Sequence, residues 1–313
     1  MIFKNILTAA MFNYNGFRNM INGKGRVQIT LESLVECVPE IKNMRLILAD
    51  NKSEDGSEKF LGGFPIGEKH VFPRAVREKG WYATSRNNLE NLRRAISMTG
   101  TSYYWNIEND SYFFNRNGFL NKAISALEAF PDISIIHLRR WTPLDCKDKP
   151  GAPQNHCRVE EIRNMKGLNL YILKRSEQDN VWVNVVEGLP KEFVPYSAED
   201  DFMSLQLGED PGCVRKTGDG WQRLIEDHYN TYTTHGYVAR SAHIRQILDE
   251  FSPKTEKEMS IAFKKRFKAA RLDEDAFISF GWNTRIHPSE EEITKMFEWA
   301  EKHNYSSVID YGR

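Results

Sequence analysis

The residues from Tyr103 to Tyr112 constrain most tightly how this chain can fold. The run starts with aromatic and apolar side chains and ends at two carboxylates, Glu108 and Asp110, with one residue between them. Such side chains favour strands, so we expect a buried strand that delivers both acids to the edge of a sheet. Hard divalent cations are commonly held by one or two carboxylates together with substrate phosphates. The pattern therefore predicts a Mg²⁺ or Mn²⁺ site, and its simpler alternative is a solvated strand end.

Length and composition narrow the class of protein. The chain has 313 residues, 40% of them hydrophobic, which is enough for one large or two modest domains. Its 43 basic residues balance 43 acidic ones, so no global positive field indicates a nucleic-acid binder. The 4 cysteines form no Cys-x-x-Cys pair, which argues against a zinc ribbon or a disulfide scaffold. Without a signal peptide or an apolar run of about 20 residues, we expect a cytoplasmic protein with no membrane span.

Strands and helices are predicted to alternate through the first half of the chain. In order, the sequence predicts a strand at 5–12, a helix at 27–41, a strand at 45–49, a helix around 89–96, the strand before Glu108, a helix at 120–127 and a strand at 133–138. This alternation predicts an α/β fold with a mainly parallel sheet flanked by helices. Ligands of such sheets bind outside the carboxyl ends of the strands. Because residues 59–79 are rich in glycine and proline, we expect an irregular surface segment there.

The second half is predicted to be a mixed α+β part. Between residues 143 and 153 the composition turns to proline, glycine, aspartate and lysine, which suggests a connection or a flap. We therefore divide the chain into 1–140 and 141–313, within one continuous globular unit. Further on, a long helix is expected to carry a cationic face from Lys264 to Arg271.

The order of the motifs resembles the nucleotide-sugar-dependent glycosyltransferases of the GT-A fold, most closely family two. The matching motifs are Tyr14-Asn15 after the first strand, Asp50-Asn51-Lys52-Ser53-Glu54-Asp55-Gly56-Ser57 after the second, Arg86-Asn87 at a helix start, and Glu108-Asn109-Asp110 after the strand that follows. The last of these stands where the family has its Asp-x-Asp signature, and its glutamate offers the same hard oxygen ligand on a longer arm. The resemblance covers about residues 5 to 140 and is weak beyond them. It implies that residues 1–140 bind the nucleotide sugar and that residues 141–313 bind the acceptor and carry the catalytic residues.

The resemblance implies a set of donor-binding residues. Asp50 is expected to contact the nucleobase or ribose, Tyr14 to stack on the base, and Asp110 to bind the metal that grips the diphosphate. The nucleotide-binding set is Tyr14, Asp50, Ser53, Asp55, Arg86 and Glu108. The donor is a nucleoside-diphosphate sugar, with a UDP-sugar favoured and Mn²⁺ or Mg²⁺ as cofactor. From the residues alone, simpler interpretations stay open: Asp50 and Asp55 can close Asx turns, Arg86 can be solvated, and Tyr14 can be packed.

The catalytic base has three candidates. In an inverting member of the family, a carboxylate from the second half removes the proton of the acceptor hydroxyl. Asp200, in Glu199-Asp200-Asp201, looks like the family's acidic pair. However, the segment from His235 to Arg240 resembles the one that usually precedes that pair, so the motif order favours Glu256 or Glu258.

Histidines could complete the metal shell. Some retaining GT-A enzymes add a late histidine ligand, and His287 or His235 could serve in that way. A lone histidine is more often a surface or hydrogen-bonded residue, so the simpler interpretation of both stays open.

Three functions remain in competition, and a fourth, nucleotidyl transfer, lacks its motif. The first is a hexosyl- or pentosyltransferase that acts on a bacterial glycan or its precursor. If the cationic face from Lys264 to Arg271 lines the acceptor groove, the alternative is a phage-type enzyme that glycosylates hydroxymethylated DNA bases, although nucleic acid is not the favoured partner. Nucleotidyltransferases share the fold, but Asn13-Tyr14-Asn15-Gly16 lacks their basic phosphate loop. The last is a non-catalytic carbohydrate-binding GT-A-like module, whose 7 tryptophans and 12 tyrosines would suit sugar stacking.

Overall fold

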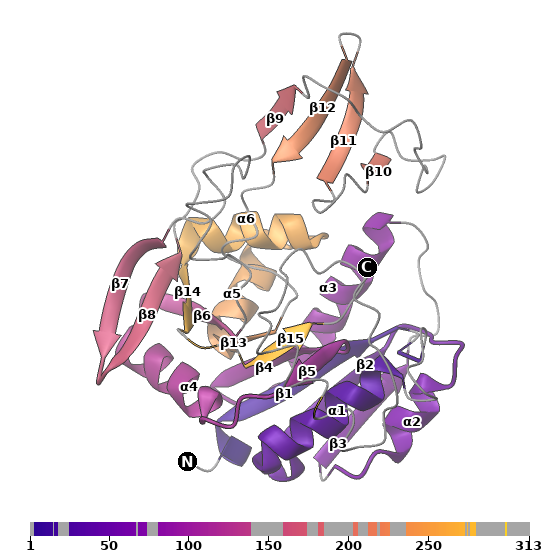
Figure 1. Ribbon diagram of the computed structural model, residues 1–313, viewed down its shortest axis with the longest axis vertical. Coiled ribbons are helices and arrows are strands. Elements are labelled where there is room, and N and C mark those ends of the chain that lie inside the picture. Colours follow the sequence, from indigo (N-terminus) through magenta and orange to yellow (C-terminus); the bar gives the residue numbers. More distant parts are fainter. Residues whose placement is uncertain are drawn as a thin grey trace.

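A computed structural model shows a large sheet with helices on both of its faces (Figure 1). The structure describes residues 3–14, 16–17, 25–66, 68–73, 81–138, 159–173, 181–184, 203–205, 212–217, 220–225, 236–272, 274, 276–279 and 298. Within these ranges, nine strands form the large sheet. In their order across the sheet, the strands are β3 (Glu68–Pro73), β2 (Arg45–Asp50), β1 (Leu7–Asn13), β4 (Tyr103–Glu108), β13 (Tyr237–Arg240), β6 (Ile133–His137), β14 (Lys268–Leu272), β8 (Leu168–Leu173) and β7 (Val159–Met165).

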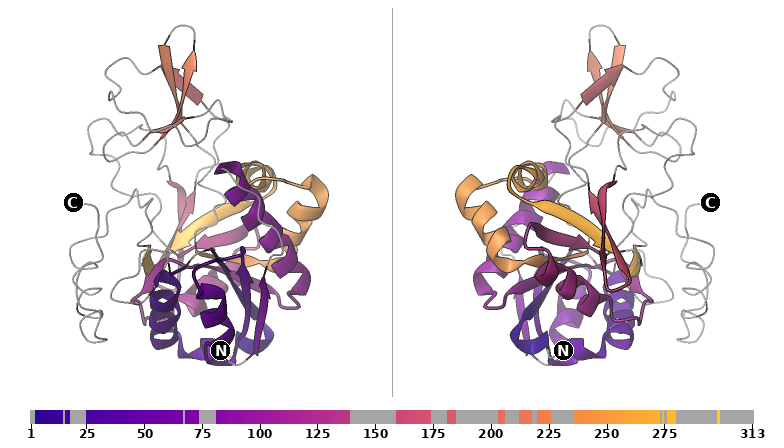
Figure 2. Two further views of the ribbon diagram at one scale, coloured as in Figure 1. Left: turned by 90° about the vertical axis from the view of Figure 1, so that its right-hand side faces the viewer. Right: turned by 90° about the vertical axis from the view of Figure 1, so that its left-hand side faces the viewer.

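The helices form two layers that cover the sheet. Their bounds are η1 (Phe3–Asn5), α1 (Arg26–Cys37), η2 (Pro39–Asn43), α2 (Ser57–Gly63), α3 (Trp81–Met98), α4 (Phe119–Ala129), α5 (Ser241–Phe251) and α6 (Glu256–Arg266). Successive strand residues point to opposite faces, so Met11 of β1 packs into the core beneath α1 and α4, whereas Ala10 packs beneath α3, α5 and α6. Figure 2 shows these helices on the two sides of the sheet.

The centre of the sheet is parallel, as the apolar runs predict. β1 lies between β2 and β4 and pairs with both in parallel. Strands that are covered on both faces read as continuous apolar runs, and the strands of this sheet centre have that pattern. The predicted α/β class, with a sheet flanked by helices, is therefore confirmed, and so is the buried strand that ends at Glu108.

The prediction of an irregular segment at residues 59–79 is wrong for residues 59–66 and 68–73, the part of it that the structure describes. α2 begins at Ser57, and β3 pairs in parallel with β2 from Glu68 to Pro73. Gly62 and Gly63, which suggested a loop, lie at the end of a short helix. Pro73 is the last residue of β3, which lies at the edge of the sheet, where a missing N–H group is tolerated.

Strands from the second half of the chain complete the same sheet. β13 is antiparallel to both of its neighbours, β4 and β6, and β8 is antiparallel to β14 and β7. β14 is parallel to β6. The sheet therefore continues without interruption from the parallel first half into a mixed second half.

The predicted cationic helix face from Lys264 to Arg271 is also wrong. α6 ends at Arg266, because Phe267 adopts an extended backbone with φ −133° and ψ 160°. Lys268 and Arg271 belong to β14, inside the sheet, and Arg271 is only 1% exposed. Its guanidinium lies over the ring of Tyr171 on β8, at 5.3 Å from the ring centroid. The cationic surface is therefore smaller than the sequence indicated.

Two smaller sheets accompany the large one. A four-stranded antiparallel sheet contains β10 (Met203–Leu205), β11 (Gly212–Thr217), β12 (Gly220–Ile225) and β9 (Val181–Asn184). It stands apart from the large sheet at the top of Figure 1. A two-stranded sheet contains β5 (Ser111–Phe113) and β15 (Phe277–Ser279). In the part of the chain that the structure describes, no helix combines the length and apolar character needed to cross a membrane.

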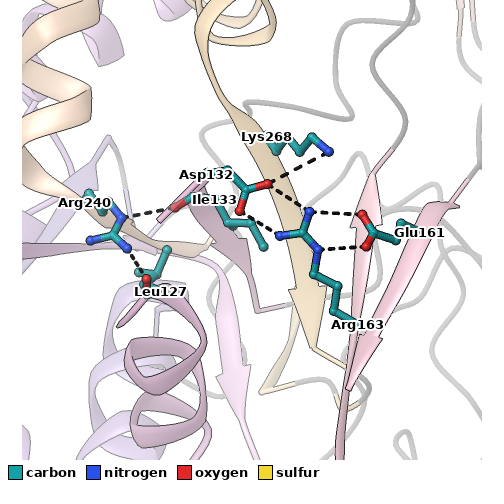
Figure 3. A network of polar contacts seen from close by, with 7 residues as sticks. All are labelled: Leu127, Asp132, Ile133, Glu161, Arg163, Arg240 and Lys268. Atoms are coloured by element: carbon teal, nitrogen blue, oxygen red, sulfur yellow. Dashed lines mark hydrogen bonds and ion pairs between the residues drawn. The ribbon is translucent and has the colours of Figure 1, made fainter. Parts of the chain in front are cut away.

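An arginine attaches the hairpin of β7 and β8 to the rest of the sheet (Figure 3). Arg163 donates from Nη1 and Nη2 to the two carboxylate oxygens of Asp132, at 2.7 and 2.9 Å, and it also binds Glu161. The hydrogen bonds from Arg163 lower the pKa of Asp132. Lys268 of β14 approaches the same carboxylate at 4.0 Å. One acid therefore joins β7, β14 and the turn before β6.

We predict that Arg163→Lys weakens this junction. Lysine keeps the charge but loses the planar fork, so we expect the free energy of unfolding to fall by about 0.5–1 kcal/mol. Urea unfolding at low and high NaCl measures the loss, which should shrink as salt screens the network. The control is Arg116→Lys, which alters the exposed ion pair with Glu36. Equal losses in the two variants would contradict a special role for Arg163.

Candidate functional site

The side chain of Asn13 lies buried at the carboxyl edge of the sheet, where β1 ends. Its Nδ2 group donates to Asp50 Oδ2 at 2.7 Å and to Ser57 Oγ at 2.9 Å, with Ser53 Oγ also within reach at 3.1 Å. Its Oδ1 atom accepts from Asn109 Nδ2 at 2.9 Å. One amide therefore joins the end of β1, the loop after β2 and the turn between β4 and β5.

The loop after β2, residues 50–57, is closed by its own side chains, and we call it the motif loop. Asp50 is fully buried and accepts from Ser53 N at 2.7 Å and from Ser53 Oγ at 2.6 Å. Asp55 accepts from Ser57 N at 3.0 Å, from Ser57 Oγ at 2.6 Å and from Phe17 N at 2.7 Å. These are side-chain turns of the Asx kind, so the turn interpretation of both aspartates is confirmed. A contact of Asp50 with a nucleobase or ribose stays a prediction.

Asn51 attaches the motif loop to both β1 and α3. Its backbone N–H donates to Asn13 O at the end of β1, at 2.8 Å, and its Oδ1 atom accepts from Nδ2 of Asn91, a residue of α3, at 2.7 Å. α3 begins at Trp81, so the predicted helix start at Arg86 is wrong. Asn87 and Asn91 lie one turn apart and are both buried, whereas Arg86 falls on the exposed side of the helix. The helix therefore presents its asparagines, and not Arg86, to its own buried face.

The turn between β4 and β5 carries Asn109 and Asp110, and α1 holds it from one side. The backbone N–H of Ser111 donates to Thr30 Oγ1 at 2.9 Å. Asp110 attracts Arg26, the first residue of α1; burial lowers the pKa of Arg26, and the charge of Asp110 opposes that shift. The acid expected to bind a metal therefore has a cationic neighbour.

Two glycines bring the end of β1 against the start of α1. A Cβ atom on Gly16 would lie 2.3 Å from Asn13 Oδ1 and 2.8 Å from Val27 Cβ. A Cβ atom on Gly25 would lie 2.2 Å from Phe17 Cδ1 and 2.6 Å from Gly16 O. Contacts under 3 Å of this kind require glycine at both positions.

Several predicted residues gather at this edge. Tyr14 directly follows β1 and is partly buried, and Glu108 and Asp110 flank the turn after β4. Among the residues with described positions, no three histidine, cysteine, aspartate or glutamate side chains form a group that could hold a metal ion. Mg²⁺ and Mn²⁺ can be held by one or two protein carboxylates with substrate phosphates completing the shell, and the metal-binding role of Asp110 and Glu108 stays a prediction. The predicted ligands His235 and His287 lie outside the described residues.

The candidate bases Glu256 and Glu258 lie in the first turn of α6. Thr255 Oγ1 accepts from Glu258 N at 3.2 Å, and Glu258 Oε2 accepts from Lys254 N at 2.8 Å. This reciprocal arrangement resembles a capping box, so Glu258 contributes to the start of the helix. Asp200 lies outside the described residues, and the role of base stays a prediction for all three acids.

Sequence reasoning missed the residues that connect the site. The motif comparison used Tyr14 and Asn15 and passed over Asn13, although Asn13 ends an apolar strand. A buried amide at one strand end, beside a carboxylate at the next, was a usable signal, because parallel strands end at the same edge. Arg26 gave no such signal, because its neighbour Asp110 is distant in the sequence.

Comparisons with known proteins give likenesses of structure only. No protein-family model matches the chain, and no protein of curated function matches it. Residues 1–349 of TarS from S. aureus are 10% identical, over 88% of this chain and 60% of that chain, with a TM-score of 0.47. The mannosyltransferase PcManGT from Pyrobaculum calidifontis, in complex with GDP-Man and Mn²⁺, is 15% identical over 43% of this chain and 35% of that chain, with a TM-score of 0.31.

A third solved structure belongs to another class of enzyme. The 4-diphosphocytidyl-2C-methyl-D-erythritol synthase from Anaerococcus prevotii is 12% identical over 95% of this chain and 99% of that chain, with a TM-score of 0.43. This chain thus spans about 60% of the TarS chain and nearly all of the synthase. At 10–15% identity a shared fold does not carry an activity with it, so the function must be inferred from the site.

We predict that Asn13→Ala weakens the contacts between the end of β1, the motif loop and the turn between β4 and β5. The substitution removes partners from a buried carboxylate and from the turn amide of Asn109, so the free energy of unfolding should fall by about 1–3 kcal/mol. Urea unfolding measures this fall, and hydrogen exchange of the Asn51 and Asn109 amides should speed up in parallel. The matched control is Asn164→Ala, which removes an exposed amide bond to Asn169. If both variants lose the same small amount, Asn13 is not the junction described here.

Proposed function

We propose that this chain is a GT-A-type glycosyltransferase that moves a sugar from a nucleoside-diphosphate donor to an acceptor hydroxyl. The observation that carries the proposal is the bonding of Asn13 to both the motif loop and the turn with Asp110. It supports a single site in which the segments implied in nucleotide binding and in metal binding share one edge of the sheet. The arrangement of sheet and helices agrees with this class of fold.

The donor's diphosphate requires positive charge. Glu108 and Asp110 would hold Mn²⁺ or Mg²⁺, with phosphate oxygens completing the shell. When bound, the ion supplies Lewis-acid stabilisation of the negative charge that builds on the departing nucleoside diphosphate. Asp50 acts, in this proposal, through the motif loop whose shape it fixes, because its carboxylate is buried and already accepts hydrogen bonds. In this proposal the base and ribose bind beside the motif loop and Tyr14.

The acceptor hydroxyl needs a base. We propose that one of the two acids on α6, Glu256 or Glu258, is this base, because the motif order favours them over Asp200. A bacterial glycan or its precursor is the acceptor that we favour. The alternative acceptor, duplex DNA, is less well supported than the sequence suggested, because Arg271 is buried and Lys268 faces Asp132.

We predict a manganese-dependent thermal shift with a nucleoside diphosphate. UDP-, GDP-, CMP- and dTDP-sugars are screened with and without Mn²⁺; a donor at 100 times its Kd should stabilise the folded chain by about 2.7 kcal/mol. In Asp110→Asn the shift that depends on Mn²⁺ should disappear, measured against the melting point of the same variant without ligand. Asp249→Asn, an exposed acid on α5, is the matched control.

The same variant separates an enzyme from a binding module. Hydrolysis of the bound nucleotide sugar, followed as release of nucleoside diphosphate, should fall at least tenfold in Asp110→Asn. A chain that binds no nucleotide sugar under any of these conditions would contradict the proposed function. A chain that binds one but never hydrolyses or transfers it would favour the non-catalytic carbohydrate-binding module.

A further inference from the structure

One face of α1 carries polar side chains into a buried interface. Positions 26, 30, 33 and 37 follow one another at helical spacing and hold arginine, threonine, serine and cysteine. Thr30 and Ser33 are completely buried, although helices normally bury apolar stripes. We call these four residues the polar stripe of α1, and such a stripe requires partners in the element that covers it.

The partners are backbone groups of β5. Ser111 N donates to Thr30 Oγ1 at 2.9 Å, Phe113 N donates to Ser33 Oγ at 3.1 Å, and Cys37 Sγ donates to Phe113 O at 3.2 Å. Successive turns of the helix thus bind successive parts of the strand. The stripe fixes the position of β5 along α1, and it fixes the preceding turn with it.

The same register brings Arg26 to Asp110. Arg26 lies one turn before Thr30, and Asp110 lies one residue before Ser111, so the helix and the strand bring the two charges side by side. The electrostatic attraction between them agrees with this register. Arg26 therefore lies at the acid to which the proposed function assigns the metal ion, where the diphosphate of the donor would bind.

We propose that Arg26 is the counter-cation of Asp110 in the metal-free protein and binds the diphosphate of the donor in the complex. This inference rests on the proposed function. A divalent ion on Asp110 would repel Arg26, and the guanidinium fork would then turn to phosphate oxygens, which it can bind in a bidentate manner. Arg26 and the metal ion therefore compete for one carboxylate and cooperate on one substrate. The protein binds diphosphate weakly even without metal.

The test measures binding, with three probes used one at a time. Titration calorimetry records the affinities of Mn²⁺ alone, inorganic pyrophosphate alone and UDP alone for the wild type and Arg26→Gln. We expect pyrophosphate and UDP to bind about 10- to 100-fold more weakly to Arg26→Gln, as for the loss of charge-assisted hydrogen bonds. Mn²⁺ should bind as tightly as before or more tightly. Arg116→Gln, which removes a charge that binds α1 at Glu36, is the control and should change none of these affinities.

A second variant tests the competition without removing Arg26. Asp110→Asn should bind Mn²⁺ at least tenfold more weakly, yet it should bind metal-free pyrophosphate severalfold more tightly, because Arg26 is released from its carboxylate. The double variant with Arg26→Gln should lose that gain. If Arg26 has a purely structural role, neither Asp110→Asn nor the double variant should bind pyrophosphate more tightly than the wild type. The result for Asp110→Asn therefore tests the proposal even if Arg26→Gln folds poorly.

The outcomes also separate the two proposals. If the wild type binds neither pyrophosphate nor UDP, with or without Mn²⁺, the proposed function itself fails. If the wild type binds them while Arg26→Gln binds equally well without metal, or Asp110→Asn shows no tighter binding of pyrophosphate, the role of Arg26 is overturned and the proposed function stands.

Discussion

The buried side-chain amide of Asn13 is the interaction on which this structure depends. A carboxamide can donate and accept at once, and here it does both across three segments that are far apart in the sequence. Without this amide, the motif loop and the turn with Asp110 would lose the side chain that hydrogen-bonds to both of them. Because the amide is buried, leaving it without partners would be costly, so the fold and the site are stabilised by the same bonds.

The polar stripe of α1 extends this coupling to a second side of the site. A helix that packed on β5 through apolar residues alone could slide by a fraction of a turn at little cost. Hydrogen bonds that individual backbone N–H groups of β5 donate to Thr30 and Ser33 exclude such sliding. The close approach of Gly16 and Gly25 sets where the helix begins. The position of Asp110 is therefore determined by the packing of α1 as much as by its own strand.

Under the proposed function, the ligand at this site is strongly anionic. Asp110 alone would repel a diphosphate, and a divalent ion or Arg26 would reverse the sign of the local field. Electrostatic stabilisation of a leaving group is most effective where charged groups are held in place before the ligand arrives. Here the hydrogen bonds between β5 and the polar stripe of α1 hold the turn that carries the acid.

The sequence by itself determined the α/β class, the central parallel strands and the acids at the end of β4, because apolar periodicity and strand propensity are local properties. It misjudged residues 59–79, the start of α3 and the strand that contains Arg271, because glycine, proline and charge are poor guides where pairing with a neighbouring strand decides the conformation. Only the tertiary structure showed that Asn13 joins the motif loop to the turn, and that Arg26 lies beside Asp110. Those contacts join residues widely separated along the chain, and no local pattern encodes which strand ends and which helix turn will meet.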